Sequence, residues 1–372
     1  MKNWMFPTMA LIVLLAATLM CTARTATVSG PDDPAAQYHA GYTILDLPWE
    51  HDPERQPLTV AVWYPTKDVE APHEYGGGLI LGSAAVDAPP AAPPAAPPAA
   101  PPAAKEGRRP FLLYSHGYGG GGICAVTLGE ALARRGWIVA APDHGDDFQA
   151  IRIRTGRQGV NVVRFALAAK RMAAQGLAFD FEKYSYRIDE ALHALNGMLA
   201  HETYEPLIDR RLIAAGGHSF GGYTTLALAG AIEGRKDDRV KAVLMLSPGL
   251  FMFDKDDFAR VAVPTMYMLG EQEQDQPRQG GTKLDLGHRA FALMAPPRYF
   301  LLIAGAEHSS FADPMRRRLG GRRSGAEESQ RRALIQRYSI AFLERHVLES
   351  EAAESVLARR DPALLEYERV LD

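Results

Sequence analysis

The serine best placed for chemistry is Ser219, in the run Gly-His-Ser-Phe-Gly at 217–221. The run follows an apolar segment at 212–215 that is typical of a strand, and it precedes a predicted helix at 223–231. A serine on such a turn presents its hydroxyl above a sheet, and the flanking glycines let strand and helix approach closely. The helix N-terminus also offers backbone N–H groups to an oxyanion. We predict that Ser219 is a nucleophile and that His218 packs locally.

A serine hydroxyl is a weak nucleophile near neutral pH, so it needs a base and a group that orients this base. For a serine on such a turn, the expected chain order is serine, acid, histidine. Three histidines follow Ser219, namely His288, His308 and His346. His308 follows an apolar segment at 299–303 through a short loop, so it can reach the serine. We predict His308 as the base, since His288 stands in a charged loop and His346 in a charged surface helix.

The carboxylate that orients this base has several candidates. A predicted strand at 265–269 leads into a polar run that begins at Gly270. Glu273 stands three residues beyond this glycine, and Asp275 stands two further on. We favour Glu273 and keep Asp275 as the first alternative. The other candidates follow the preceding strand at a distance of several residues, and they are Asp254 and Asp256.

A competing motif is the run Gly-Tyr-Gly-Gly-Gly-Gly at 117–122, which fits the glycine spacing of dinucleotide-binding loops. It follows a predicted strand, opens a predicted helix and has Asp143 about 20 residues on. A nicotinamide-dependent oxidoreductase is therefore one alternative function. Against it, polar Ser115 and His116 end the strand, and the serine turn and the histidine loop stay unexplained. A binding protein with an incomplete triad is the other alternative.

The elements that must position these residues alternate between strand and helix along the chain. Apolar runs bounded by glycine or proline predict strands, and apolar residues three and four apart predict helices. This alternation indicates an α/β fold with a mostly parallel central sheet and helices on both faces. The segment 147–186 is longer than a simple crossover requires, so we expect a small helical cap there. The remaining predicted strands are 58–64, 111–114, 137–141 and 240–246, and the remaining helices are 125–135, 160–175, 187–200 and 327–348.

Composition bounds the class of protein. The chain has 372 residues, of which 47% are hydrophobic and 23% charged, as in a soluble globular protein. Its net charge is −3, from 41 basic and 44 acidic residues, so nucleic acid is not expected as a partner. The histidines are scattered and no cysteine pair has the spacing of zinc ligands, so no metal site is expected. We expect no cofactor, and the sequence does not specify an oligomeric state.

The first 23 residues have the pattern of an export signal, with a basic start, an apolar run at 9–20 and small residues up to Ala23. The run is shorter than the ~20 residues that cross a bilayer, so no integral membrane span is expected. We predict a secreted or periplasmic protein. A lipid anchor on Cys21 is less favoured, because the bulky Met20 precedes it.

Residues 24–372 are then expected to form a single catalytic domain. Cys124 is the only cysteine left, so no disulfide is expected within this domain. Its place at the start of a predicted helix favours a small buried residue. Between 88 and 104, four copies of Pro-Pro-Ala-Ala favour an extended polyproline conformation. We interpret this segment as an exposed insertion between two strands.

Five motifs make the chain resemble the α/β-hydrolase superfamily, in particular its dienelactone-hydrolase-like and platelet-activating-factor-acetylhydrolase-like carboxylesterases. The resemblance extends over about residues 42–350, outside the polyproline segment and the segment 147–186. The motifs are Val62-Trp63-Tyr64-Pro65, Leu113-Tyr114-Ser115-His116-Gly117, Ala141-Pro142-Asp143-His144, Gly217-His218-Ser219-Phe220-Gly221-Gly222 and Gly305-Ala306-Glu307-His308-Ser309-Ser310-Phe311-Ala312-Asp313.

The resemblance implies hydrolysis of a small-molecule or lipid-like ester through an acyl-enzyme. It implies that the backbone N–H groups of Tyr118 and Phe220 form the oxyanion hole, and Tyr118 is a candidate to line the substrate pocket. Relatives place the triad acid in a Gly-x-x-Asp run, where this chain has Glu273. The acetylhydrolase branch can instead place it just after the preceding strand. There this chain has Ser247-Pro248, which favours Glu273.

Overall fold

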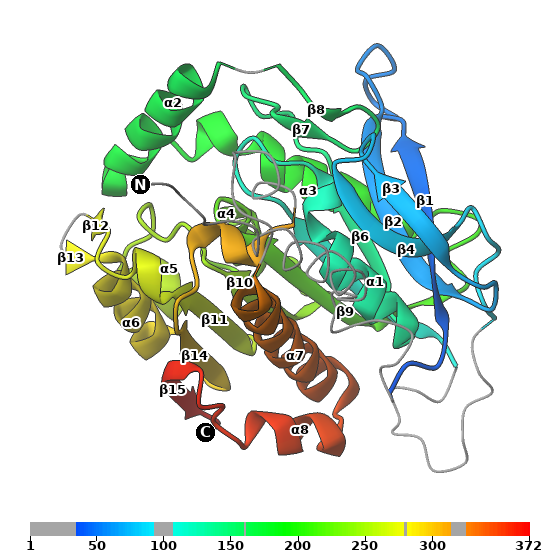
Figure 1. Cartoon of the computed structure of the whole chain (residues 1–372). Coiled ribbons are helices and arrows are strands. Elements are labelled where there is room, and N and C mark those ends of the chain that lie inside the picture. The colour runs from blue at the N-terminus through cyan, green and yellow to red at the C-terminus, as the bar shows by residue number, and fades with distance from the viewer. Residues whose placement is uncertain (1–34, 93–106, 160, 279–280, 314–324) are drawn as a thin grey trace, which may run out of the picture.

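The computed structural model describes residues 35–92, 107–159, 161–278, 281–313 and 325–372, and its fold is of the predicted α/β class (Figure 1). A single 11-stranded sheet runs through the described chain. Its centre is a block of six parallel strands. In spatial order the block contains β14 (Arg298–Ile303), β11 (Thr265–Gly270), β10 (Val240–Leu246), β9 (Ile208–His218), β5 (Arg109–Ser115) and β6 (Ile138–Pro142).

Strands that are mostly antiparallel to their neighbours extend this block at both edges. At one edge, the C-terminal strand β15 (Leu364–Val370) pairs with β14. At the other edge β2 (Leu58–Thr66) pairs with β6, and β1 (His39–Leu47) pairs with β2 along its whole length. Outside these lie β4 (Ile80–Val86) and β3 (Ala71–Tyr75). Of these edge strands, the sequence predicted only β2.

Helices cover both faces of the sheet, as predicted. One face packs against α1 (Val126–Arg134), α7 (Ala326–Leu348) and α8 (Glu351–Leu357). The other face packs against α3 (Tyr186–Met198), α4 (Gly221–Leu228), α5 (Lys255–Ala259) and α6 (Lys283–Leu293). Since both faces are covered, the inner strands are mostly apolar and do not alternate between apolar and polar residues. In β10, for example, six of the seven side chains are buried.

The segment between β6 and α3 contains a short hairpin and a helix. The hairpin pairs β7 (Ile151–Arg152) with β8 (Gly156–Arg157), and the helix is α2 (Val162–Ala174). The side chain of Asn161 caps this helix by accepting from the N–H of Arg164. Figure 1 shows α2 and the hairpin on the same side of the molecule, beyond one end of the sheet. The helix predicted at 160–175 is thus confirmed as α2.

Three sequence predictions fall wholly or partly on residues outside the described ranges. These are the export signal at 1–23, the lipid anchor at Cys21 and most of the proline-rich segment, of which 88–92 are described.

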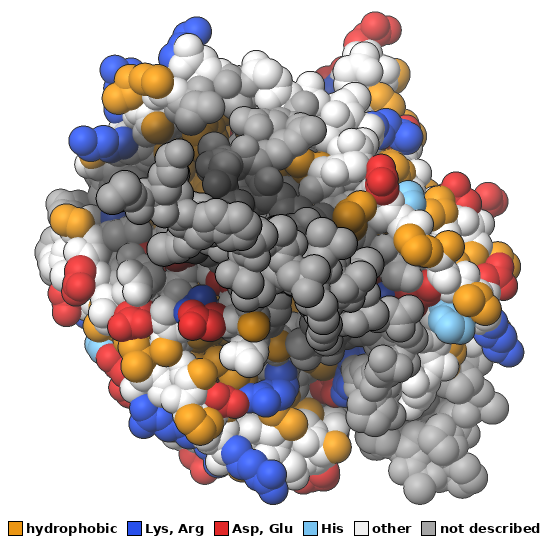
Figure 2. Space-filling view, viewed as in Figure 1, with side chains coloured by type: hydrophobic (Ala, Val, Ile, Leu, Met, Phe, Trp, Pro, Cys, Tyr) orange, Lys and Arg blue, Asp and Glu red, His pale blue; other side chains and the backbone are white. Residues whose placement is uncertain are grey.

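Within the described ranges, no helix is long and apolar enough to cross a membrane. On the described part of the face in Figure 2, acidic and basic side chains are interspersed, as the net charge of −3 leads one to expect.

Candidate active site

Ser219 lies on the turn that joins β9 to α4. Its φ of +54° is in the left-handed region, which a serine adopts only at a local cost. The turn is fixed by its backbone, because the N–H of Ser219 donates to the carbonyl of Leu246 at 3.0 Å and its carbonyl accepts from the N–H of Gly249 at 2.8 Å. The strained residue is therefore held by neighbouring segments, as expected where a side chain must be presented.

The glycines on either side of the serine are required by close backbone contacts. A Cβ on Gly217 would lie 2.5 Å from the carbonyl oxygen of Gly221. A Cβ on Gly221 would lie 1.9 Å from the carbonyl oxygen of Ser115, at the end of β5. Helix α4 can therefore start directly against two strands, as the motif predicts.

His308 begins a 3₁₀ turn (His308–Phe311) that follows β14, and its ring reaches the serine. Its Nε2 lies 2.8 Å from the hydroxyl oxygen of Ser219. Its Nδ1 lies 2.8 Å from Oε2 of Glu273, which follows β11. Glu273 is 1% exposed, whereas the side chain of His308 is 40% exposed. The three predicted triad residues thus come together at the carboxyl ends of β9, β11 and β14.

The other candidate acids lie elsewhere. Asp275 is exposed, and no contact of its side chain with His308 is found among the described residues. Asp254 caps α5 by accepting from the N–H groups of Asp256 and Asp257. Asp256 is also exposed. Among these carboxylates, Glu273 alone is in hydrogen-bonding contact with the base in the described structure.

Glu273 is held by two further side chains that the sequence analysis did not identify as part of the site. The ammonium of Lys283, at the start of α6, donates to its Oε2. The hydroxyl of Ser247 donates to its Oε1 at 2.6 Å and also lies 2.7 Å from Nδ1 of His308. Lys283 in turn donates to the Ser247 oxygen at 2.7 Å. Ser247 follows β10, where the sequence analysis considered an alternative position for the acid. In this chain its hydroxyl instead contacts Glu273, which follows β11.

The electrostatics of this group favour an ionised acid and a neutral base. Burial acts to raise the pKa of Glu273, but Lys283 and His308 outweigh it and hold this pKa well below its usual range. Burial and the nearby Lys283 charge lower the pKa of His308 below 6.5, against the opposing effect of Glu273. Near neutral pH, His308 is therefore uncharged and able to accept a proton.

We expect that Lys283→Met will move the acid limb of the kcat/KM profile for ester hydrolysis to higher pH. The base works only while it is neutral, and loss of the nearby positive charge raises the pKa below which it is protonated. A shift on the order of one pH unit is expected from a neighbouring charge. Lys255→Met, on an exposed lysine of α5, is the matched control and should leave the limb in place. An unchanged limb in a folded Lys283→Met enzyme would contradict this account of the base.

The predicted oxyanion donors lie beside the serine. A Cβ on Gly117 would lie 3.1 Å from Cβ of Ser219, so the Gly117–Tyr118 peptide borders the nucleophile. Phe220 directly follows the serine at the start of α4. Among the hydrogen bonds between described residues, none uses the backbone N–H of Tyr118 or Phe220. Both groups remain available to an acceptor next to Ser219.

The glycine-rich loop at 117–122 does not have the contacts of a dinucleotide cradle. The N–H of Gly119 donates to Asp146 and the N–H of Gly122 donates to Asp143, both at 2.8 Å. Asp143 also accepts from the N–H of Ile153, so its carboxylate is occupied by backbone groups. A phosphate would have to displace these carboxylates. The geometry therefore does not favour the oxidoreductase alternative.

A second serine, Ser115 at the end of β5, has a similar set of neighbours. Its Oγ lies 2.8 Å from Nε2 of His144, whose Nδ1 lies 3.0 Å from Oε2 of Glu190. Ser115 is 3% exposed and His144 is 1% exposed, whereas Ser219 is partly exposed. Burial also raises the pKa of Glu190 to about 7, so this acid is not fully ionised near neutral pH. Geometry alone would not separate the two sets, but access and charge favour Ser219.

His218, His346 and Cys124 lie outside the triad and have local contacts or are buried. Nε2 of His218 lies 3.0 Å from the carbonyl oxygen of His308, which steadies the loop of the base. His346 is half-buried against the Tyr299 hydroxyl, so its expected surface position is wrong. Cys124 is buried as predicted, and burial raises its pKa to about 12.

His288 lies in α6 and not in a loop as expected, with its Nε2 2.7 Å from Glu366 of β15. Among the described residues, His288, Glu366 and Glu368 place ligand-type atoms within 4.8 Å of one another. Exposed acidic groups commonly lie this close without a metal ion, and none of these residues contacts the triad.

Comparisons with known proteins address the fold. No protein-family model matches the chain. A ferulic acid esterase from Streptomyces cinnamoneus superimposes with a TM-score of 0.60 over 90% of this chain and 98% of that one, at 20% identity. The chain has the α/β-hydrolase fold. The fold that the motif resemblance implies is thereby confirmed.

A curated relative also matches part of the sequence. The platelet-activating factor acetylhydrolase of Cavia porcellus is 23% identical over 229 residues, which are 55% of this chain and 48% of the relative. The match thus spans about half the length of that relative. The chain is therefore distantly similar in sequence to one branch named in the sequence analysis.

Proposed function

We propose that the protein is a serine hydrolase that cleaves carboxylic esters through an acyl-enzyme intermediate. The observation that carries the proposal is the continuous contact from Ser219 through His308 to Glu273, with 2.8 Å at each link. The names of the two similar proteins, an acetylhydrolase and an esterase, support ester hydrolysis. A complete set of three groups also argues against a binding protein with a degraded site.

In this mechanism, Ser219 attacks the acyl carbonyl while Nε2 of His308 takes the hydroxyl proton. Glu273 holds the ring with Nδ1 protonated and stabilises the imidazolium that forms. The N–H groups of Tyr118 and Phe220 stabilise the tetrahedral oxyanion. His308 then gives its proton to the leaving alcohol, and water repeats the cycle on the acyl-enzyme.

Aromatic rings next to the serine support a small or lipid-like ester as substrate. The ring of Tyr118 stacks on Phe165 of α2 at 5.9 Å and meets Phe220 edge-on at 6.0 Å. Phe148 packs edge-on against Phe165 at 6.0 Å. We propose that the segment 147–186 caps the site and contributes these rings to the substrate pocket. Export directed by residues 1–23 stays a prediction from sequence.

A panel of 4-nitrophenyl esters with acyl chains of increasing length tests the proposed activity. We expect turnover of at least one chain length, with a rate that nicotinamide cofactors leave unchanged. The background control is Ser219→Ala, prepared in the same way. A protein that hydrolyses none of the esters, or that depends on a nicotinamide cofactor, would contradict the proposal.

A further inference from the structure

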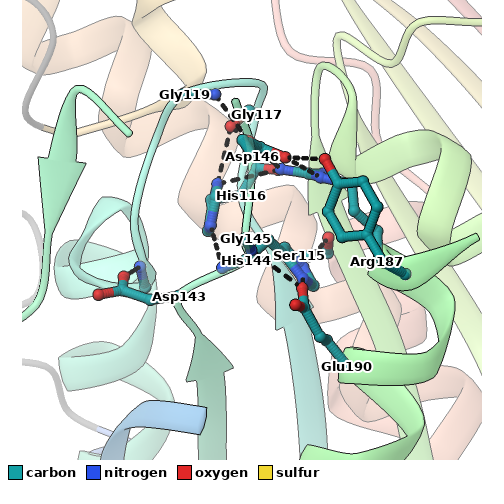
Figure 3. A network of polar contacts seen from close by, with 12 residues as sticks. Ser115, His116, Gly117, Gly119, Asp143, His144, Gly145, Asp146, Arg187 and Glu190 are labelled. Atoms are coloured by element: carbon teal, nitrogen blue, oxygen red, sulfur yellow. Dashed lines mark hydrogen bonds and ion pairs between the residues drawn. The ribbon is translucent and has the colours of Figure 1, made fainter. Parts of the chain in front are cut away.

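A buried polar network lies directly behind the proposed oxyanion loop (Figure 3). Its centre is the ion pair between Arg187, in α3, and Asp146, and both residues are almost fully buried. The pair is bidentate, because Nε of Arg187 donates to Oδ1 at 2.8 Å and Nη2 donates to Oδ2 at 2.9 Å. The hydroxyl of Tyr186 donates to Oδ1 at 2.8 Å. Nothing in the mechanism above uses these groups.

The remaining donors of the guanidinium reach the backbone of the loop. Nη1 of Arg187 donates to the carbonyl of His116 at 2.9 Å, and Nη2 donates to that of Gly117 at 3.4 Å. On the other side, Asp146 accepts from the N–H of Gly119 at 2.8 Å. The ion pair is therefore hydrogen-bonded to the loop on both sides of Tyr118, at Gly117 and at Gly119.

The carbonyl of Gly117 is the most heavily bonded group of the loop. It accepts from Nδ1 of His116 at 2.7 Å and from the N–H of Gly120 at 2.9 Å, besides the Arg187 contact. This carbonyl shares a planar trans peptide unit with the N–H of Tyr118, and the two groups point in opposite directions. Fixing the carbonyl therefore fixes the direction of the N–H. Donors on the carbonyl also polarise the amide and strengthen its N–H as a donor.

The protonation state of His116 is fixed by the same network. Its Nε2 accepts from the backbone N–H of His144 at 3.0 Å, so the proton is on Nδ1, which faces the Gly117 carbonyl. Burial and the nearby Arg187 charge hold the pKa of His116 well below its usual range. The ring thus stays neutral and keeps donating to the loop.

Arg187 also contacts the second proposed donor residue. Its guanidinium carbon lies 4.8 Å from the centre of the Phe220 ring, an arrangement typical of a cation–π contact. One side chain thus contacts residues of both segments that border Ser219. A buried pair that served only stability would not need this placement, since its desolvation cost often cancels its attraction.

We propose that Arg187 and Asp146 are positioning residues that orient the Gly117–Tyr118 peptide, so that the Tyr118 N–H stabilises the oxyanion. The inference rests on the proposed function. It predicts an effect on the transition state and not on substrate binding, because the oxyanion exists only in the former.

The test compares Arg187→Lys with the wild-type protein. Lysine keeps the charge beside Asp146 but lacks the planar fork that reaches the carbonyls of His116 and Gly117. We expect kcat on 4-nitrophenyl esters to fall on the order of 10- to 100-fold with little change in KM. Binding of an aryl trifluoromethyl ketone, whose hemiketal oxyanion resembles the tetrahedral intermediate, should weaken by a similar factor.

The control is Arg134→Met, which breaks another buried arginine–carboxylate pair, between Arg134 and Glu70 in a different part of the fold. It should lower the melting temperature but leave kcat per folded molecule unchanged. A second variant, Asp146→Asn, covers the case in which Arg187→Lys does not fold, and the same split between kcat and KM is expected.

Two results would overturn the inference. The first is a folded Arg187→Lys or Asp146→Asn enzyme with wild-type kcat and wild-type affinity for the ketone. The second is a kcat that falls only in proportion to the folded fraction, as a purely structural pair predicts. Either result with an active wild-type enzyme leaves the proposed function intact. A wild-type protein without ester turnover would instead contradict the proposed function, and the inference with it.

Discussion

The Ser219→Ala protein should fold normally and lose ester turnover, with kcat lowered at least on the order of 10³-fold. The hydroxyl oxygen is the group that attacks, and it is the atom that lies 2.8 Å from the base. Alanine removes only this oxygen, so the turn and its backbone contacts should survive. His308→Ala should cost about as much, because the members of a triad act as a unit. Initial rates and thermal unfolding of the purified variants measure both effects.

The informative comparison is Ser115→Ala, which removes the other serine that has a histidine and a glutamate beside it. Because Ser115 is buried, its loss should leave turnover of the same order as in the wild type. A Ser219→Ala enzyme that keeps wild-type kcat would refute the mechanism. A loss of turnover in Ser115→Ala alone would mean that Ser115, and not Ser219, is the nucleophile.

The second large effect is expected for Glu273→Gln, with kcat lowered on the order of 10²- to 10⁴-fold. The amide fills the same space but carries no charge, so the tautomer and the imidazolium of His308 lose their support. Lys283 would also lose its buried partner, which costs stability in addition to activity. Turnover and melting temperature should therefore both fall.

The double variant Glu273→Gln/Lys283→Met separates these two effects. Removing the unpaired ammonium should recover much of the stability, while turnover should stay low. Asp275→Asn, on the exposed neighbouring acid, is the control for the loop and should be nearly as active as the wild type. If Asp275→Asn lowered kcat severely while Glu273→Gln kept a normal kcat, the triad acid would be Asp275.

The parallel core of the fold was predictable, because its strands are buried on both faces. Segments such as 240–246 and 265–269 are apolar at all but one position each, and the structure has β10 and β11 there. The edge strands were not predictable in this way. β3 contains a proline, a histidine and a glutamate among its five residues, and β15 has three charged residues in seven. These strands are defined by backbone pairing with the adjacent strand, β4 for β3 and β14 for β15, which a local pattern of polarity does not record.

The candidate site was predictable where its residues follow strands that the sequence marks clearly. Ser219, Glu273 and His308 each follow such a strand within a few residues, and parallel strands bring their carboxyl ends to one edge. Lys283 and Arg187 could not be found in this way. Each lies on a helix and reaches the site through the packing of that helix, and neither is part of a motif. Charged side chains are also rarely buried in full, so a sequence pattern predicts an exposed position for each of these two residues.

The proposed acyl-enzyme chemistry is tested most directly by reaction with a fluorophosphonate, followed by intact-mass and peptide-mass measurement. This reagent forms a stable covalent adduct with a serine that a neighbouring base activates. The account predicts one adduct per chain, located on Ser219 within the peptide that contains residues 217–221, and loss of ester turnover in step with labelling. A fully active protein without an adduct, or an adduct on Ser115 in place of Ser219, would contradict it.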